Sequence, residues 1–422
     1  RRRTGPTHPT NISLTALSDA ACPGAPLAPA AGTPLPANRT ACSELAGGTG
    51  LWHTQLLVGV HSAPSHSQRR AAIRASWMQW ASVGRSVVVC FLIGRDGLSK
   101  ARARSLEAEA ALHRDILLLD VADRVVLSLP KTFGWWRAAA ALIAQGTAVR
   151  WVAKLDDDSF VHLPNLEAGL RRLHCHRHLY LGSFARSGYD PVRLAKCGFS
   201  WTGSDNYRRY GCQARGAEPP TLFALGAVQV LAAPLVRALA ASPGLRAFIA
   251  HARALRRGYK VDSEDVALGY WLATRTPLHV EQHREHHGER VRYVQMPPNS
   301  VFNIHCFSST GMYQVPGDAA WVVHHLKRPQ GMGYLWRRLH DRAPHDANAC
   351  LTATVIGLPP GFRDALVVAC PANHSSCVTT RLLRRGGQKM LSCQSSPRKT
   401  KQRGARAQGG RRSTCCACGY IN

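Results

Sequence analysis

The feature that most constrains the fold is an alternation of short apolar runs with helix-like segments along the first half of the chain. Apolar runs at residues 54–60, 86–94, 115–120 and 150–156 predict strands, and the segments 67–80, 100–114 and 133–145 predict helices. Strands that alternate with helices form a mostly parallel sheet, which binds ligands beyond the carboxyl ends of its strands. The sequence therefore predicts an α/β fold with its site at that edge.

Three consecutive carboxylates, Asp156, Asp157 and Asp158, follow the apolar run at 150–156. Side chains alternate along a strand, so Asp156 and Asp158 should leave on one side and Asp157 on the other. Clustered carboxylates repel one another unless a cation lies among them. Oxygen ligands suit Mg²⁺ or Mn²⁺, ions that commonly also bind a diphosphate. We therefore expect a metal-nucleotide site here, with a plain acidic loop as the alternative.

The second half of the chain has a less regular pattern. We expect a helix over 164–174 and then a long Gly-, Tyr- and Arg-rich loop region over 180–220 that shapes an acceptor site. A strand is predicted at 221–232, followed by a helical stretch over 235–257 that is interrupted at Pro243 and Gly244.

Composition divides the chain into three parts. Residues 1–50 are rich in Pro, Ala, Gly and Thr and are expected to form a flexible stalk, whereas 51–345 should be the ordered catalytic domain. The formal net charge is +29, and no acidic residue follows Asp364. We expect 346–422 to be a basic, Cys-containing and largely disordered tail.

The cysteines indicate the compartment. Fourteen cysteines and the acceptor sequences at Asn11, Asn38 and Asn373 favour the secretory lumen. Cys197 and Cys212 bracket a polar, Tyr-rich loop and are candidates for a disulfide, although connectivity stays open. No apolar run approaches the ~20 residues that span a bilayer. Because the chain starts at Arg1, we expect an N-terminal membrane anchor that is not in this chain.

Four segments stand in a family's characteristic order: RRAAIRASW (69–77), WVAKLDDDSF (151–160), VDSEDVALGYWL (261–272) and WVVHHLK (321–327). In them the chain resembles the inverting β-1,3-glycosyltransferases, which comprise the β-1,3-galactosyltransferases and their N-acetylglucosaminyl- and Fringe-type relatives. The resemblance spans roughly residues 52–340. It implies a GT-A type nucleotide-sugar-binding fold in a Golgi type II membrane protein that uses a UDP-sugar and Mn²⁺.

The resemblance also implies roles for the acids of the triplet. Asp158 would bind the metal, while Asp157 and Asp156 would hold the ribose and support the metal site. His324 matches the histidine that completes the metal shell in several family members. Adjacent strand residues face opposite ways, which favours His324 over His325 as the ligand.

Further residues follow from the same matching. Arg74 would lie near the nucleotide, and Lys131 matches a family lysine that precedes the fourth strand. Inversion also needs a carboxylate that takes the proton of the acceptor hydroxyl. Glu264 and Asp265 are the candidates, with Asp265 preferred as the base. The alternative is that both acids only stabilise a helix N-terminus, by ~0.3–1 kcal/mol each.

The predicted reaction is metal-dependent transfer of a hexose, galactose first, from a UDP-sugar to a glycan or glycoprotein hydroxyl, with a β-1,3 linkage formed. Transfer of N-acetylglucosamine on the same fold is the alternative. The chain departs from the family at RVVLSLP (124–130) and at Gln229, which leaves the acceptor open. The pI of about 10.4 suggests nucleic-acid binding as an alternative function. However, the basic residues lie in a tail without interleaved aromatics, so no nucleic-acid partner is expected. A catalytically inactive sugar-binding relative is the third reading.

Overall fold

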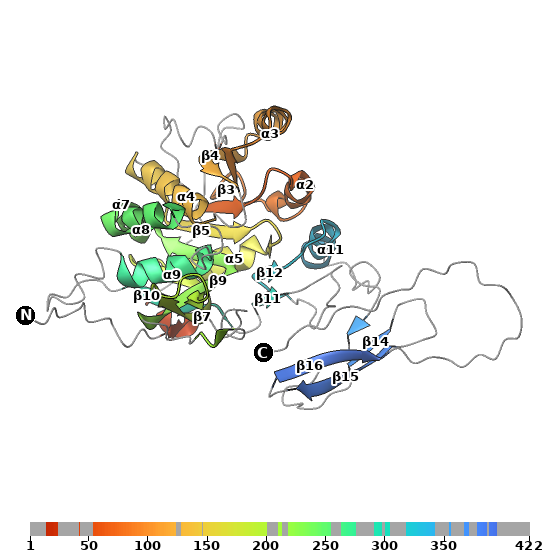
Figure 1. Ribbon diagram of the computed structural model, residues 1–422. Helices are drawn as coiled ribbons and strands as arrows, with labels where there is room; N and C mark the ends of the chain where they lie inside the picture. The colour runs from red at the N-terminus through yellow and green to blue at the C-terminus, as the bar shows by residue number, and fades with distance from the viewer. Residues whose placement is uncertain are drawn as a thin grey trace, which may run out of the picture.

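The computed structural model describes residues 14–23, 42, 54–123, 128–145, 147–200, 210–212, 218–254, 263–275, 291–297, 300–303 and 318–341, together with four strands after residue 353. Figure 1 shows a central sheet with helices on both of its faces. The acceptor sequences at Asn11, Asn38 and Asn373 lie outside the described residues.

The central sheet has the strand order β1-β10-β7-β9-β5-β2-β3-β4, with β8 beside β7. Its strands are β1 (Leu14–Ala16), β2 (Leu56–His61), β3 (Val87–Asp96), β4 (Ile116–Ala122), β5 (Trp151–Asp156), β7 (Leu179–Asp190), β8 (Gly198–Ser200), β9 (Glu218–Ala232) and β10 (Arg292–Gln295). The β5-β2-β3-β4 half is parallel throughout, whereas β9 is antiparallel to β5 and β7. The predicted α/β fold with a mostly parallel sheet is confirmed.

Both faces of this sheet are buried, because alternate residues of β3 pack into two separate apolar cores. The helices are α1 (Leu17–Ala20), α2 (Ser67–Arg74), α3 (Lys100–His113), α4 (Ser128–Ala144), α5 (Leu163–Arg171), α7 (Ala233–Ala241), α8 (Pro243–Ala254), α9 (Glu264–Thr274) and α11 (Gln330–Leu339), with a 3₁₀ turn at Trp77–Gln79. The core on one face includes buried residues of α2, α5 and α11, and the other includes those of α4, α7, α8 and α9 (Figure 1).

A second, three-stranded sheet consists of β11 (Val301–Asn303), β12 (Val322–His324) and β6 (Phe160–Val161). β12 is antiparallel to β6, which begins two residues after Asp158. The main-chain N–H of Leu326 also donates a hydrogen bond to the carbonyl oxygen of Asp158, at 2.9 Å. This small sheet therefore brings the carboxyl end of β12 against the acid triplet.

Two predicted segments differ from the structure. The region 180–220, expected to be a loop, contains most of β7, all of β8 and the start of β9. β7 lies between β9 and β10 and is hydrogen-bonded to both. Main-chain pairing on both sides allows a strand to contain polar residues, and these residues obscured the alternation that would have predicted it. The helix expected over 67–80 ends at Arg74, and a 3₁₀ turn follows. The interruption predicted at Pro243 is present, since Ser242 separates α7 from α8.

Residues 14–23 do not behave as the expected stalk. β1 pairs with β10 in parallel, and Cys22 forms a disulfide with Cys175. Main-chain pairing and a disulfide need no apolar periodicity, which is why composition missed them. In 346–422 the strands β13 (Thr354–Val355), β14 (Val367–Cys370), β15 (Val378–Arg385) and β16 (Gln388–Gln394) form an antiparallel sheet where disorder was expected. In the sequence, two consecutive glycines stand between β15 and β16, which is a hairpin signal. The prediction of disorder rested on the charge of the tail and did not use this signal.

Two further disulfides are present within the part of the chain that the structure describes. Cys197 pairs with Cys212, as predicted, and Cys42 pairs with Cys90. Among the described residues, the helices are too short or too polar to cross a bilayer.

Candidate active site

The acid triplet stands at the carboxyl end of β5, where the chain turns into β6. Asp156 is the last residue of β5, and its carbonyl oxygen accepts a hydrogen bond from the main-chain N–H of Ser159 at 3.1 Å. The N–H of Asp157 donates to the carbonyl oxygen of His61 at 3.0 Å, which ties the turn to the end of β2. The triplet therefore lies at the edge predicted for the site.

Asp156, Asp158 and His324 come together at this edge. One potential ligand atom from each lies within 4.8 Å of the other two. His324 Nε2 is 3.2 Å from Asp158 Oδ1 and 3.4 Å from Asp156 Oδ2. Apart from its contact with His324, the buried Asp158 Oδ1 has no hydrogen-bond partner among the described residues. Two carboxylates and an imidazole form a donor set that suits a divalent cation such as Mn²⁺.

Charge explains the ionisation of this cluster. Burial raises the pKa of Asp158, but the neighbouring His324 and Lys327 outweigh it and hold that pKa well below its usual range. Burial lowers the pKa of His324, whereas Asp156 and Asp158 raise it, and the net direction is upward. The Lys327 ammonium donates a hydrogen bond to Asp158 Oδ2, from a side chain that is half exposed.

Asp157 has different side-chain partners from Asp156 and Asp158. Ser62 Oγ donates to Asp157 Oδ2 at 2.8 Å, and His66 Nδ1 lies 2.7 Å from the same oxygen. Arg69 Nη1 donates to Asp157 Oδ1 at 2.7 Å. Both oxygens of Asp157 are thus engaged, one by the loop after β2 and the other by α2, so this carboxylate fastens the β2–α2 region to the triplet.

Lys154 was not singled out from the sequence, although a lysine inside the apolar run WVAKLD is an available signal. Its side chain is fully buried, and Nζ donates to Asp156 Oδ1 and to Glu264 Oε1, each at 2.8 Å. Burial lowers the pKa of Lys154, but the two carboxylates outweigh it and raise that pKa above its usual value. Lys154 therefore connects the cation cluster to the start of α9.

Glu264 and Asp265 occupy the first turn of α9. Glu264 Oε2 also accepts a hydrogen bond from Ser128 Oγ at 3.2 Å. Asp265 is partly buried, and its Oδ1 accepts a hydrogen bond from the N–H of Val266 at 2.8 Å. Removal from water and, next, the charge of Glu264 raise the pKa of Asp265 to about 7. A carboxylate with that pKa suits proton abstraction near neutral pH.

Close packing against Asp156 requires a glycine on β9. A Cβ atom at Gly226 would lie 2.8 Å from Asp156 Oδ2 and 3.8 Å from Lys154 Nζ. A larger residue there would displace the carboxylate of Asp156.

Lys131 contacts the segment that bonds Asp157, whereas Arg74 does not. Lys131 Nζ donates to the carbonyl oxygen of Ser62 at 2.5 Å and to Asp123 Oδ2 at 2.9 Å. Burial lowers the pKa of Lys131 against the opposing charge of Asp123.

The predicted place of Arg74 near the nucleotide is corrected by its contacts. Arg74 donates to both oxygens of Asp115, at 2.7 and 2.8 Å, and to Glu109 at 2.9 Å. Asp115 directly precedes β4, which β2 and β3 separate from β5 in the sheet, so Arg74 is held to one side of the triplet rather than against it. The arginine of this segment that contacts the triplet is Arg69.

Comparison with known proteins identifies the family. The sequence profile described as Galactosyltransferase matches residues 68–283, and the chain therefore belongs to the galactosyltransferase family. The α/β fold is accordingly of the GT-A type, and the expected enzyme class, a glycosyltransferase, is confirmed.

Two curated relatives illustrate the breadth of the family. The chain is 31% identical over 239 residues to Beta-1,3-galactosyltransferase 6 of Mus musculus, covering 55% of this chain and 62% of that protein. It is 32% identical over 217 residues to an acetylgalactosaminyl-O-glycosyl-glycoprotein beta-1,3-N-acetylglucosaminyltransferase of Homo sapiens, covering 47% and 50%. The chain thus spans less than two thirds of the length of either relative.

Among solved structures, the galactosyltransferase LgtC in complex with donor and acceptor sugar analogs is 10% identical, with a TM-score of 0.33. That match covers 70% of this chain and 100% of the LgtC chain. At that score it supports no conclusion about this chain.

Proposed function

We propose that this chain catalyses metal-dependent, inverting transfer of a hexose, galactose first, from a UDP-sugar to a glycan or glycoprotein hydroxyl with formation of a β-1,3 linkage. The observation that carries this proposal is the juxtaposition of two sets of acids at one edge of the sheet. Asp156, Asp158 and His324 form the cation cluster, and Lys154 joins it to the acids of α9.

The residues present fit a divalent cation. Asp156 and Asp158 supply oxygen, and His324 supplies nitrogen. In the described part of the chain the buried Asp158 Oδ1 has no hydrogen-bond partner other than His324. Mn²⁺ accepts such a mixed set of oxygen and nitrogen ligands. When bound, the ion neutralises the negative charge that develops on the departing diphosphate.

The protein's own groups complete the reaction. Asp265, with its pKa raised to about 7, takes the proton of the attacking acceptor hydroxyl. Glu264 is held by Lys154 and Ser128, and so it orients the first turn of α9 while remaining the second candidate for the base. Asp156 and Asp157 are proposed to hold the ribose, and Lys131 lies within the same group of charges.

Transfer of N-acetylglucosamine is the second candidate, because one of the similar human proteins is named for it. The three disulfides are typical of the secretory lumen. We therefore propose that the protein acts in the Golgi lumen as a type II membrane protein whose anchor lies outside this chain.

A panel of UDP-sugars tests the proposal. The chain is incubated with each donor and a galactose- or N-acetylhexosamine-terminated acceptor, in Mn²⁺ and in EDTA, and the product linkage is determined by NMR. Transfer from UDP-galactose in Mn²⁺ to a 3-hydroxyl, lost in EDTA, is expected. Equal activity in EDTA would exclude metal dependence, and preference for UDP-N-acetylglucosamine would select the second candidate.

A further inference from the structure

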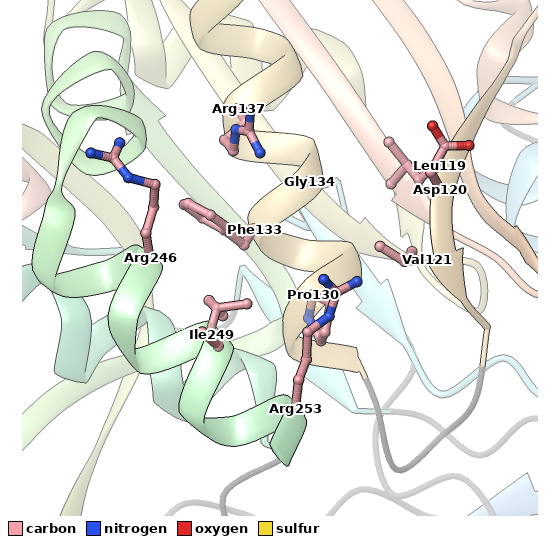
Figure 2. Close-up of a pocket in the computed structure, with 11 residues that line it drawn as sticks. Leu119, Asp120, Val121, Pro130, Phe133, Gly134, Arg137, Arg246, Ile249 and Arg253 are labelled. Atoms are coloured by element: carbon pink, nitrogen blue, oxygen red, sulfur yellow. The ribbon is translucent and has the colours of Figure 1, made fainter. Parts of the chain in front are cut away.

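A cavity of about 380 Å³ lies between α4, α8 and the end of β4. Figure 2 shows its lining side chains, with Phe133 and Ile249 in the middle and three arginines around them. Arg137 comes from α4, and Arg246 and Arg253 come from α8. The cavity is of the size that holds small ligands, which typically take about 300–1,000 Å³.

The cavity combines an apolar floor with positive charge. Its apolar part includes Leu119, Pro130 and Phe133, and the guanidinium of Arg137 lies 5.9 Å from the centre of the Phe133 ring. Among the described residues no carboxylate pairs with any of the three arginines. The single acid in the lining, Asp120, is largely exposed and is already paired with Arg95 at 2.5 Å.

This chemistry selects an anion carried on a body with an apolar face. Guanidinium groups form paired, charge-assisted hydrogen bonds with sulfate and carboxylate oxygens. Phe133 and Ile249 are mostly buried, and the small part of each that is exposed gives the cavity an apolar floor for the C–H edge of a sugar ring. A concave pocket with its charges around an apolar centre fits a discrete ligand better than it fits a flat membrane surface.

The cavity also adjoins the candidate active site. Lys131, on the first turns of α4, reaches Ser62 and Asp123 on the side of the triplet. Its chain neighbours Pro130 and Phe133 line the cavity instead. The first turns of α4 therefore contribute side chains to both sites, and the lining residues Leu119, Asp120 and Val121 stand shortly before Asp123, which pairs with Lys131.

We propose that this cavity binds a sulfated or carboxylated sugar of the acceptor glycan. That the ligand is part of the acceptor rests on the proposed function. The binding itself requires no turnover. Arg137, Arg246 and Arg253 hold the anionic group, and Phe133 packs against the sugar ring.

Calorimetric titration of the 422-residue chain tests this, with 6-sulfated N-acetyllactosamine and its unsulfated parent as matched probes. The sulfated probe should bind about tenfold more tightly, which corresponds to about 1.4 kcal/mol. The double change Arg137→Gln and Arg253→Gln should abolish this difference. Ala250→Trp, at an exposed helix position that lines the cavity, should weaken the binding of both probes without altering charge.

Arg104→Gln is the control, because it removes the same charge from an exposed site on α3 outside the cavity. Equal affinity for the two probes, or the same loss in Arg104→Gln, overturns the proposal. Binding of phosphatidylserine vesicles that depends on these arginines, without sugar binding, also overturns it and would assign the arginines to a membrane. Competition by UDP for the sulfated probe overturns it as well and would assign the cavity to the donor.

The two proposals fail separately. Sulfate-dependent sugar binding in a chain that transfers no sugar from any UDP-donor would leave the cavity standing and remove the proposed reaction. UDP-galactose transfer to neutral acceptors, with no preference for the sulfated probe, would support the proposed reaction and remove the proposed role of the cavity.

Discussion

Two groups of ion pairs flank the parallel half of the sheet, and they differ in charge balance. In the first, which we call the α2–α3 cluster, Arg70 and Arg74 pair with Glu109 and Asp115 at 2.6–2.9 Å. Two cations face two anions, and each charge has a direct partner. In the candidate site, by contrast, acids outnumber the lysines that contact them.

The site's surplus of negative charge is visible in its members. Lys154 forms ion pairs with both Asp156 and Glu264, and Lys327 forms one with Asp158. Burial and, after it, the negative charge of Glu264 raise the pKa of Asp265. Balanced charges hold a fold together, whereas an unbalanced group attracts a cation, so the two clusters should respond oppositely to mutation.

The largest effect should follow Asp158→Ala. Removal of a carboxylate from the cation cluster should abolish measurable transfer, while the melting temperature changes little because the surplus of negative charge also falls. Transfer assays and thermal denaturation in Mn²⁺ and in EDTA measure both. Near-normal transfer by this variant would show that the cluster does not hold the metal.

Asp265→Asn should lower transfer by on the order of 10²-fold or more, with UDP-sugar affinity retained. The wild-type rate should rise with pH through about 7, as Asp265 loses its proton. Because its folded pKa exceeds the ordinary value of 3.8, Asp265 costs stability as the pH rises from about 4 to 7. Asn should therefore raise the melting temperature at pH 8 more than at pH 5.

Glu264→Gln is the matched control for Asp265. A small loss of rate there supports Asp265 as the base. A loss of about 10²-fold in Glu264→Gln, with Asp265→Asn active, would move the base by one residue.

His324→Ala should weaken apparent Mn²⁺ affinity by about 10- to 100-fold and leave some activity at saturating metal. Asp156 and Asp158 remain to hold the ion, which makes this loss milder than that of Asp158. His325→Ala is the control, because the neighbouring ring lies outside the ligand cluster. Metal titrations of activity and of intrinsic Trp fluorescence distinguish the two variants.

Lys154→Met should lower stability by about 2–4 kcal/mol, because it leaves Asp156 and Glu264 without their shared partner. Transfer should fall by about tenfold through misplacement of both groups of acids. Lys154→Arg keeps the charge and should restore part of the activity if electrostatic bridging matters. Urea denaturation gives the stability change, and separate kcat and KM values give the effect on transfer.

Arg74→Gln should have the smallest effect on transfer, within about twofold, while it lowers stability by about 1–3 kcal/mol. Its loss unbalances the α2–α3 cluster without touching the candidate site. Chemical denaturation and initial rates at saturating donor measure the two effects. A large loss of donor affinity would return Arg74 to the nucleotide site and end the contrast between the clusters.

Much of the fold was predictable because its signals are local. The apolar runs around β2, β3, β4 and β5 carried enough residues of one kind to set strand and helix order. The strand at 179–190 was missed because its sequence is polar and has no clear alternation. Its main-chain hydrogen bonds are made with β9 and β10, and the local sequence does not reveal such pairing.

The acids of the site were predictable for the same reason, because Asp156, Asp157 and Asp158 follow a strand directly. The choice between arginines was not. Arg69 and Arg74 are five residues apart on α2, and at about 100° per residue they point to different sides of the helix. Only the packing of α2 against α3 decided that Arg74 meets Asp115 while Arg69 meets Asp157.

The sequence by itself determined the α/β alternation and the place of the three acids, Asp156 to Asp158, at a strand end. The tertiary structure alone decided that Lys154 reaches Glu264, 110 residues later in the chain. It also decided that α4 and α8 enclose a cavity lined by three arginines. Local patterns fix local geometry, but such long-range contacts depend on how each helix is rotated and seated on the sheet, and that is set by the packing of the whole core.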